Sequence, residues 1–217
     1  MKKPYVKICC ITSLREAWMA MEAGASALGL VGHMPSGPGI IGDNLIAEIV
    51  RAVPPPVATF LLTSQTSAGA IIRHHRKVHT NSLQLVDIPE SGSYEEIRRV
   101  LPAIKIVQVI HVTGEESVDQ ALTIANEVDA LLLDSGNPAL KVKILGGTGQ
   151  KHDWKISRRI VEEAPVPVFL AGGLNPENVR EAIEQVDPFG LDLCNGVRTH
   201  GKLDQKKLEA FFRAIEV

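Results

Sequence analysis

The sequence predicts a single-domain α/β protein spanning residues 1–217, folded as a (β/α)8 barrel of the TIM type, and three observations support this prediction. Short apolar runs rich in Val, Ile and Leu recur along the whole chain. Segments with the helical spacing of apolar residues lie between them. The sequence carries no linker, charge block or low-complexity tract that would mark a second domain. Apolar strands that alternate with helices are typical of a parallel sheet covered by helices, and about eight such units fit one compact barrel.

The expected strands are the apolar runs themselves. They cover residues 5–11, 27–32, 57–63, 82–86, 105–112, 130–135, 166–172 and 190–196. Apolar residues at i, i+3, i+4 and i+7 predict helices in three of the intervening or terminal segments. These residues are Leu14, Ala17, Trp18 and Met21, then Val179, Ala182, Ile183 and Val186, and finally Leu208, Phe211, Phe212 and Ile215. Asn175-Pro176 predicts a helix start. Periodicity does not show whether the sheet closes, so a doubly wound open sheet is the structural alternative.

Composition and charge bear on which kinds of binding partner and which cellular compartment are expected. The chain is 45% hydrophobic with a formal net charge of -2, which gives no sign of nucleic acid or an anionic membrane as a partner. No apolar run reaches the length of a membrane span, and Lys7 interrupts the apolar stretch that follows the basic start. Three cysteines, two of them adjacent, favour reduced thiols in a cytoplasmic protein. Nothing in the sequence decides between a monomer and a homodimer.

The first strand contains a charge and two thiols within the stretch VKICCIT. Alternate side chains of a strand share a face, so Lys7 and Cys9 are expected on one side and Cys10 on the other. A thiol beside an ammonium group has its thiolate form favoured. The stretch is therefore either an accident of packing or the beginning of an active site.

Polar residues gather near the expected carboxyl ends of the strands, where barrels of this type place their active sites. They are Cys9, Gln84, His111, Asp134, Asp192, Cys194 and Asn195. Cys9 and Asp134 form a plausible base and acid pair from opposite parts of the barrel. For either residue alone, a structural role is the simpler interpretation.

Glycine loops follow the seventh and eighth expected strands, where such barrels commonly bind phosphate. LAGGLNPEN contains Gly172 and Gly173, and DLCNGVR contains Asn195 and Gly196. An isolated glycine pair would only indicate a turn, but two glycine loops at both expected places favour phosphate binding. A third loop, GGTGQKHDW, contains Gly147 and is expected to cover the site. It lacks the pattern of a Walker loop.

The segment IIRHHRKVH places His75 and His79 one helical turn apart. No acidic or thiol ligand accompanies them, and the neighbouring Arg and Lys side chains would repel a cation. A solvated helix face is the better interpretation, and we expect no metal site.

These motifs together resemble the phosphoribosylanthranilate isomerase family along nearly the whole chain. The KICGIT-like strand of the family corresponds to residues 7–12, and its ALGFVF-like strand to 27–32. Its LLLD strand corresponds to 131–134, and its GGTG loop to 146–149. LAGGLNPENV is present intact at 170–179, and the closing DxSSGVE stretch corresponds to 192–198.

The resemblance implies an Amadori rearrangement of an aminoaldose phosphate to an aminoketose, in the pathway of tryptophan biosynthesis. Carried over from the family, Asp134 is the general acid that opens the ribose ring, and Cys9 is the general base. Lys7 would favour the thiolate of Cys9, whereas Cys10, in place of the family's glycine, is expected to face the helices as a small packing residue. The substrate's own amine serves as electron sink, so no metal or organic cofactor is expected.

The candidate site also departs from the family pattern. Gly39 stands nearest the place of an arginine that faces the anthranilate carboxylate, a loss worth about 1.5–3 kcal/mol. The histidine of the family's QLHG stretch is missing from residues 84–87, and its fifth-strand arginine is replaced by His111. Cys194 and Asn195 replace two serines, and Arg198 replaces the final glutamate.

Three hypotheses remain open at this point. The first is the isomerase itself, with Arg198 or His111 compensating for the missing arginine. The second is a related barrel enzyme acting on another phosphorylated aminosugar, and the third is a non-catalytic binder of phosphoribosyl ligands. The first is favoured. The candidate residues for binding substrate and phosphate are Lys7, Gln84, His111, Gly147, Gly172, Gly173, Asp192, Cys194, Asn195, Gly196 and Arg198.

Overall fold

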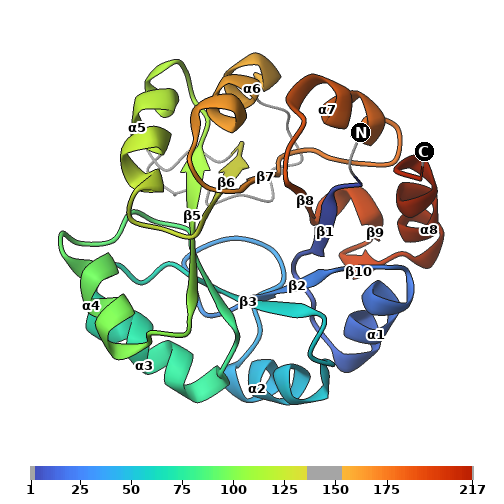
Figure 1. Cartoon of the computed structure of the whole chain (residues 1–217). Helices are drawn as coiled ribbons and strands as arrows, with labels where there is room; N and C mark the ends of the chain where they lie inside the picture. Colours follow the sequence, from blue (N-terminus) through green and yellow to red (C-terminus); the bar gives the residue numbers. More distant parts are fainter. Residues whose placement is uncertain (1–2, 136–152, 217) are drawn as a thin grey trace.

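The computed structural model describes residues 3–135 and 153–216 and shows a closed parallel barrel surrounded by helices (Figure 1). The barrel strands are β1 (Tyr5–Ile8), β2 (Ala27–Val31), β3 (Ala58–Thr63), β4 (Ser82–Leu85), β5 (Lys105–His111), β6 (Ala130–Asp134), β7 (Val168–Leu170) and β8 (Gly190–Leu193). The helices are α1 (Leu14–Glu22), α2 (Asp43–Ala52), α3 (Ala68–Val78), α4 (Ser93–Val100), α5 (Glu116–Ala125), α6 (Trp154–Glu163), α7 (Val179–Val186) and α8 (Gln205–Ala214). A short helix η1 (Asn195–Val197) and a hairpin of β9 (Arg198–Thr199) and β10 (Lys202–Leu203) follow β8. The predicted barrel is confirmed.

Each strand pairs in parallel with its neighbours in chain order, and β1 pairs with β8 to close the sheet. Side chains along a strand alternate between two cores. In β6, Leu131 and Leu133 pack in the layer between the sheet and the helices, whereas Ala130 and Leu132 pack with the residues inside the barrel. Closure rules out the open doubly wound sheet.

Side-chain caps fix where several helices begin. Ser13 accepts a hydrogen bond from the Glu16 amide at the start of α1, and Asp204 accepts from the amides of Lys206 and Lys207 at the start of α8. The expected helix start at Asn175-Pro176 is displaced, since α7 begins at Val179. The Asn175 side chain instead accepts from the amides of Glu177 and Asn178 and closes a turn before the helix.

The expectation of a solvated histidine face on α3 is wrong for His75. This residue is buried and its Nε2 lies 2.8 Å from the carbonyl oxygen of Thr80, beyond the end of the helix. Burial lowers the pKa of His75, so the imidazole acts as a neutral core group. His79 is exposed, as expected, and ends α3 with a left-handed φ of 57°. In residues 3–135 and 153–216, no group of three or more His, Cys, Asp and Glu side chains is placed to hold a metal ion.

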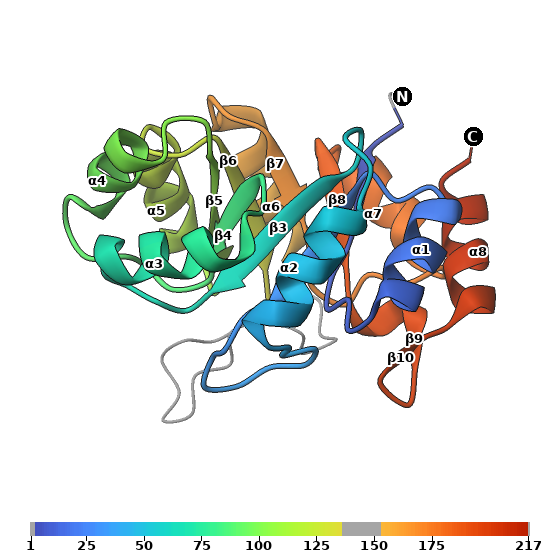
Figure 2. The same cartoon turned by 90° about the horizontal axis from the view of Figure 1, so that it is seen from below.

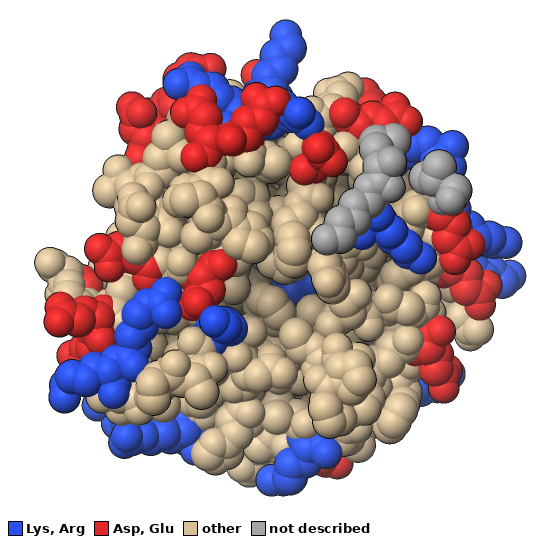
Figure 3. Space-filling view, viewed as in Figure 1, with Lys and Arg blue, Asp and Glu red and all other residues tan. Residues whose placement is uncertain are grey.

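The loop after β2 and the β9–β10 hairpin project from the same end of the barrel, the end at which the strands finish (Figure 2). Figure 3, which is viewed as in Figure 1, shows acidic and basic side chains interspersed around the rim and other residues over most of the centre. Within the described part of the chain, no helix is long and apolar enough to cross a membrane. The projecting loops therefore mark the end on which a site would be built.

Removal of the Phe211 ring from α8 is expected to destabilise the barrel by about 3–5 kcal/mol, because this fully buried side chain leaves a cavity when truncated. The measurement is chemical denaturation of Phe211→Ala against wild type. Lys206→Ala, at an exposed position of the same helix, serves as control and should change the free energy of unfolding by less than about 0.5 kcal/mol. Equal effects of the two changes would contradict this view of the core.

Candidate active site

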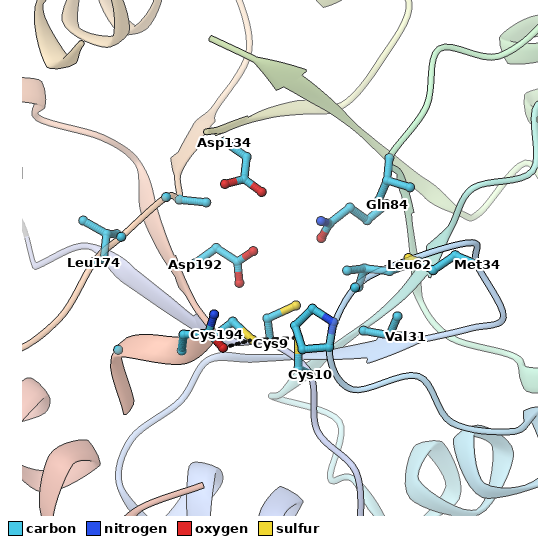
Figure 4. Close-up of a pocket in the computed structure, with 18 of the residues that line it drawn as sticks. Cys9, Cys10, Val31, Met34, Leu62, Gln84, Asp134, Leu174, Asp192 and Cys194 are labelled. Atoms are coloured by element: carbon cyan, nitrogen blue, oxygen red, sulfur yellow. Dashed lines mark hydrogen bonds between the residues drawn. The ribbon is translucent and has the colours of Figure 1, made fainter. Parts of the chain in front are cut away.

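A cavity opens at the carboxyl ends of the strands and is built from residues far apart in the sequence. Figure 4 shows Cys9, Gln84, Asp134 and Asp192 reaching into one central space from different strands. Nine of the predicted site residues line it, namely Cys9, Gln84, Asp134, Gly172, Gly173, Asp192, Cys194, Asn195 and Gly196. The two glycine loops and the expected base and acid therefore meet in one place.

Three of the predicted site residues that the structure describes are not part of this lining. Lys7 lies beneath it, fully buried inside the barrel. His111 ends β5 beside Asp134, and its Nε2 lies 3.2 Å from the carbonyl oxygen of Val86. Arg198 is turned away into the protein, and Gly147 lies outside the described residues.

Lys7 and Asp192 form a buried ion pair across the seam between β1 and β8. Lys7 Nζ donates to Asp192 Oδ1 at 2.8 Å, and the ammonium lies 5.4 Å from the centre of the Phe60 ring. Burial is the largest single influence and would lower the pKa of Lys7, but the charge and hydrogen bond of Asp192, together with the two neighbouring thiols, outweigh burial and raise it. Lys7 is therefore a permanent positive charge under the floor of the cavity.

Asp134 is a buried carboxyl group that has no ion-pair partner among the residues that the structure describes. Its Oδ1 accepts a hydrogen bond of 2.7 Å from the Ser135 amide. Burial raises the pKa of Asp134, and the negative charge of Asp192 adds to the rise, although the Ser135 amide, His111 and Lys7 oppose it. Two carboxyl groups thus face one cavity in different electrostatic surroundings, which is the arrangement expected when one of them must hold a proton.

Cys9 shares its side of the chain with Lys7, as predicted. Both side chains lie over Gly29 of β2, where an added Cβ would stand 2.8 Å from Cys9 Sγ and 3.0 Å from Lys7 Nζ. Only a residue without a side chain leaves room for both groups. The effect of Lys7 on the Cys9 thiolate stays a prediction.

The expectation that Cys10 faces the helices is wrong. β1 ends at Ile8, and Cys10 has a left-handed φ of 63°, so the alternation of a strand no longer applies. Cys10 instead lines the cavity, where its Sγ lies 2.8 Å from Sγ of Cys194 (Figure 4).

Arg198 does not replace the arginine that the family directs at the substrate. Its guanidinium pairs with Glu16, with Nη1 3.0 Å from Oε1, and donates to the carbonyl oxygens of Cys9 and Cys10. Glu16 also accepts from the amides of Thr12 and Leu203. This buried ion pair fastens the turn after Cys9 to the β9–β10 hairpin, a role that the charge of Arg198 alone did not reveal.

Sequence reasoning missed the apolar wall of the cavity. Val31, Met34, Pro38, Leu62 and Val86 contribute to it from three neighbouring strands and the loop after β2. The only signal was the unusual MPSGPGII loop, which identified the region but not the direction of its side chains.

Gly39, in that loop, lies directly against Cys10. It has a φ of +75°, and a Cβ added there would stand 2.5 Å from Cys10 Cβ and 2.8 Å from Cys10 Cα. A larger side chain at position 39 and any side chain at position 10 therefore compete for one space.

Gln84 brings an unsatisfied polar atom into the same cavity. The residue is buried, and its Oε1 has no hydrogen-bond partner in the described structure. A buried acceptor of this kind carries a desolvation cost that a bound donor would relieve. The side chain points toward the cavity (Figure 4), so that donor would belong to a ligand.

A closed parallel barrel with acids, thiols and glycine loops converging at the carboxyl ends of its strands defines the class of (β/α)8-barrel enzymes. Comparisons with known proteins then identify the family. The model of N-(5'-phosphoribosyl)anthranilate (PRA) isomerase matches residues 6–214. The chain therefore belongs to the phosphoribosylanthranilate isomerase family, and the resemblance found in its motifs is confirmed.

Individual relatives of this family match the chain over almost its whole length. N-(5'-phosphoribosyl)anthranilate isomerase 2 of Methanosarcina mazei is 37% identical over 95% of this chain and 91% of its own. The crystal structure of phosphoribosyl anthranilate isomerase from Thermotoga maritima is 30% identical, with a TM-score of 0.82 and 98% of each chain covered. A further structure of the enzyme, in complex with reduced 1-(o-carboxyphenylamino)-1-deoxyribulose 5-phosphate, is 28% identical with a TM-score of 0.80 over 98% of each chain.

The Glu16–Arg198 pair generates a prediction about acid stability. Burial would raise the pKa of Glu16, but hydrogen bonds from Arg198, Leu203 and Thr12 outweigh burial and hold it below its ordinary value of 4.5. A lowered folded-state pKa contributes stability above the ordinary pKa and loses it as the pH falls through the folded value. Glu16→Gln should therefore lower the free energy of unfolding by roughly 2 kcal/mol near pH 7, with the difference from wild type shrinking below about pH 4.5.

The measurement is urea denaturation of both proteins at a series of pH values. Glu209→Gln, on the exposed face of α8, is the matched control and should track wild type throughout. A difference that stays constant from neutral to acidic pH would show that the Glu16 charge is not the source of the effect.

Proposed function

We propose that this protein catalyses the Amadori rearrangement of phosphoribosylanthranilate to the corresponding aminoketose, a step of tryptophan biosynthesis. The observation that carries the proposal is the convergence of Cys9 and Asp134 on one cavity that also contains both glycine loops. Family membership supports the same conclusion, since it implies an intramolecular isomerase that uses acid–base chemistry.

Asp134 is proposed to be the general acid. Its raised pKa, caused first by burial, keeps a larger fraction of the carboxyl protonated near neutral pH than a solvated aspartate would have. The proton would pass to the ring oxygen of the ribose, whose C–O bond then breaks to give a Schiff base of the substrate's amine.

Cys9 is proposed to be the general base. As a thiolate it would remove the proton from the sugar carbon next to the Schiff base, and the resulting enolamine relaxes to the ketone. Lys7 lies beneath the cavity and close to the Cys9 sulfur, and its own charge is paired with Asp192. The electrons return to the substrate's nitrogen, so these two residues suffice for the proton transfers.

The phosphate is proposed to lie against the two glycine loops. Gly172 and Gly173 have φ values of 82° and 65°. Glycine adopts this left-handed conformation without the steric cost that other residues have. Gly196 packs on the Leu174 carbonyl oxygen, which a Cβ would overlap. The two loops therefore stand in contact and both line the cavity, and their backbone amides are the proposed donors to the phosphate.

A second candidate, a related isomerase with a different aglycone, is favoured by one specific observation. The wall opposite the phosphate loops is apolar, and Arg198 is held elsewhere by Glu16. An uncharged group would suit this wall better than a carboxylate. Gln84, with its unpartnered Oε1, would accept a hydrogen bond from either kind of substrate.

The cytoplasm is the proposed location, supported by the three cysteines, all of which are free thiols.

Turnover of phosphoribosylanthranilate, generated in situ and followed by its fluorescence, tests the proposal. Cys9→Ala and Asp134→Asn should each lower kcat/KM by about 10²–10⁴-fold, because each removes one proton-transfer group. Asp119→Asn, on the exposed surface of α5, is the control and should keep wild-type turnover. Absence of turnover by folded wild type would sink the assignment to this substrate and favour the different aglycone.

The contact between Gly39 and Cys10 generates a second prediction. Gly39→Arg alone should destabilise the protein by about 1–3 kcal/mol, because the new side chain overlaps Cys10. The double change Cys10→Gly with Gly39→Arg removes the contact with the Cys10 Cβ and should recover part of the loss, because the Cα of residue 10 still stands 2.8 Å from the new Cβ and the φ of +75° remains. If anthranilate is the aglycone, the double variant should also lower KM roughly tenfold relative to Cys10→Gly alone, through a new carboxylate partner.

Thermal unfolding and KM of the wild type, both single variants and the double variant are the measurements. Additive effects of the two changes on stability would mean that positions 10 and 39 do not share one space.

A further inference from the structure

We propose that Cys10 and Cys194 are a redox-active pair that closes into a reversible disulfide within the substrate cavity. The thiols come from the ends of two adjacent strands, β1 and β8, which are joined by the register Ile8↔Leu193. Their sulfur atoms lie 2.8 Å apart, and a disulfide is about 2.05 Å long, so closure needs a movement of less than about 1 Å.

The conformation of Cys10 indicates that this thiol is not a simple packing group. A φ of 63° costs a residue with a Cβ roughly 1–2 kcal/mol, and glycine would avoid that cost. The family to which the chain belongs is expected to have glycine at position 10 and serine at position 194, from the motif comparison above. Both thiols are thus departures from that pattern, and they touch each other.

The surroundings give the two thiols different chemical characters. The hydrogen bond between them lowers the pKa of Cys194 and raises that of Cys10. The positive charge of Arg198 also favours the Cys194 thiolate. Cys194 is half-buried and lines the cavity, so a small oxidant that enters with solvent can reach it. Cys194 is then the attacking sulfur and Cys10 the resolving one.

The oxidant is a small peroxide, and the step balances with hydrogen peroxide. The Cys194 thiolate attacks one oxygen, the O–O bond breaks, and the departing hydroxide takes up a proton as water. The Cys10 sulfur then attacks the Cys194 sulfenic acid, the S–S bond forms, the S–O bond breaks, and the second water leaves with the Cys10 proton. Two electrons pass from the thiol pair to the peroxide, and a dithiol reverses the change by exchange.

Closure would affect catalysis because both sulfur atoms stand beside functional groups. Cys10 follows Cys9 directly, and Cys194 precedes the Asn195-Gly196 loop. A shift of up to about 1 Å in either segment displaces the base or the phosphate loop, and misplacements of this size can cost about 10²-fold in rate. Cys9 itself keeps its thiol. The expected loss of catalytic rate rests on the proposed function, whereas formation of the Cys10–Cys194 disulfide does not.

The test treats the reduced full-length protein with hydrogen peroxide at a small molar excess and then maps its thiols. Three free thiols should fall to one, and mass spectrometry should find a peptide pair joined through Cys10 and Cys194. The same link should form in Cys9→Ser and be absent from Cys10→Ser and Cys194→Ser. Turnover of the wild type should fall at least tenfold and return after dithiothreitol.

Other results would overturn the proposal. These are persistence of all three thiols, a link that includes Cys9, or oxidation that ends in a sulfinic acid without any link. If a variant fails to fold, the fragment masses of the linked wild-type peptides still show whether Cys9 or Cys10 is bonded to Cys194. If the wild type has no isomerase turnover, the thiol count and the peptide map still decide the question independently of the proposed function.

Discussion

The buried ion pair between Lys7 and Asp192 is the constraint on which the site depends. These two residues are direct register partners on β1 and β8, so the pair spans the seam where the first strand meets the last. Each charge alone would be costly to bury, and each is retained only because the other is there. The pair places a fixed positive charge beside Cys9 and a fixed negative charge near Asp134. The same ion pair therefore joins the first barrel strand to the last and sets the charges around the cavity.

A second buried pair, Glu16 with Arg198, acts on the backbone rather than on the cavity. Glu16 accepts amides from Thr12 and Leu203, and Arg198 donates to the carbonyl oxygens of Cys9 and Cys10. The turn after the proposed base is thus tied to the hairpin after the phosphate loops. The Glu16–Arg198 pair thus holds the turn after Cys9 in place relative to the β9–β10 hairpin, which explains how a short β1 ending at Ile8 can still position Cys9.

The sequence predicted what strand periodicity and parallel topology determine, and little of what single backbone conformations determine. Cys9, Asp134 and Asp192 were located because carboxyl ends of parallel strands must converge at one end of a barrel. Cys10 was misplaced because a φ of 63° breaks the alternation of side chains, and no local pattern signals that conformation. Arg198 was assigned to the substrate because a charge at a strand end was assumed to face the cavity. Its partner Glu16 lies 182 residues away in the sequence, so only the folded chain brings the two together.

Three of the departures from the family pattern, at positions 10, 39 and 194, can be understood as one physical change. Cys10 occupies the space that a side chain at position 39 would need, so a thiol at position 10 and a glycine at position 39 accompany each other. Cys194 meets that thiol from β8, so the third substitution completes the same contact. Asp134 and the Gly172-Gly173 loop line other parts of the same cavity and are not in this contact. The proposed acid, the proposed base and the Gly172-Gly173 loop therefore keep the family pattern, while the rim of the cavity at positions 10, 39 and 194 differs from it.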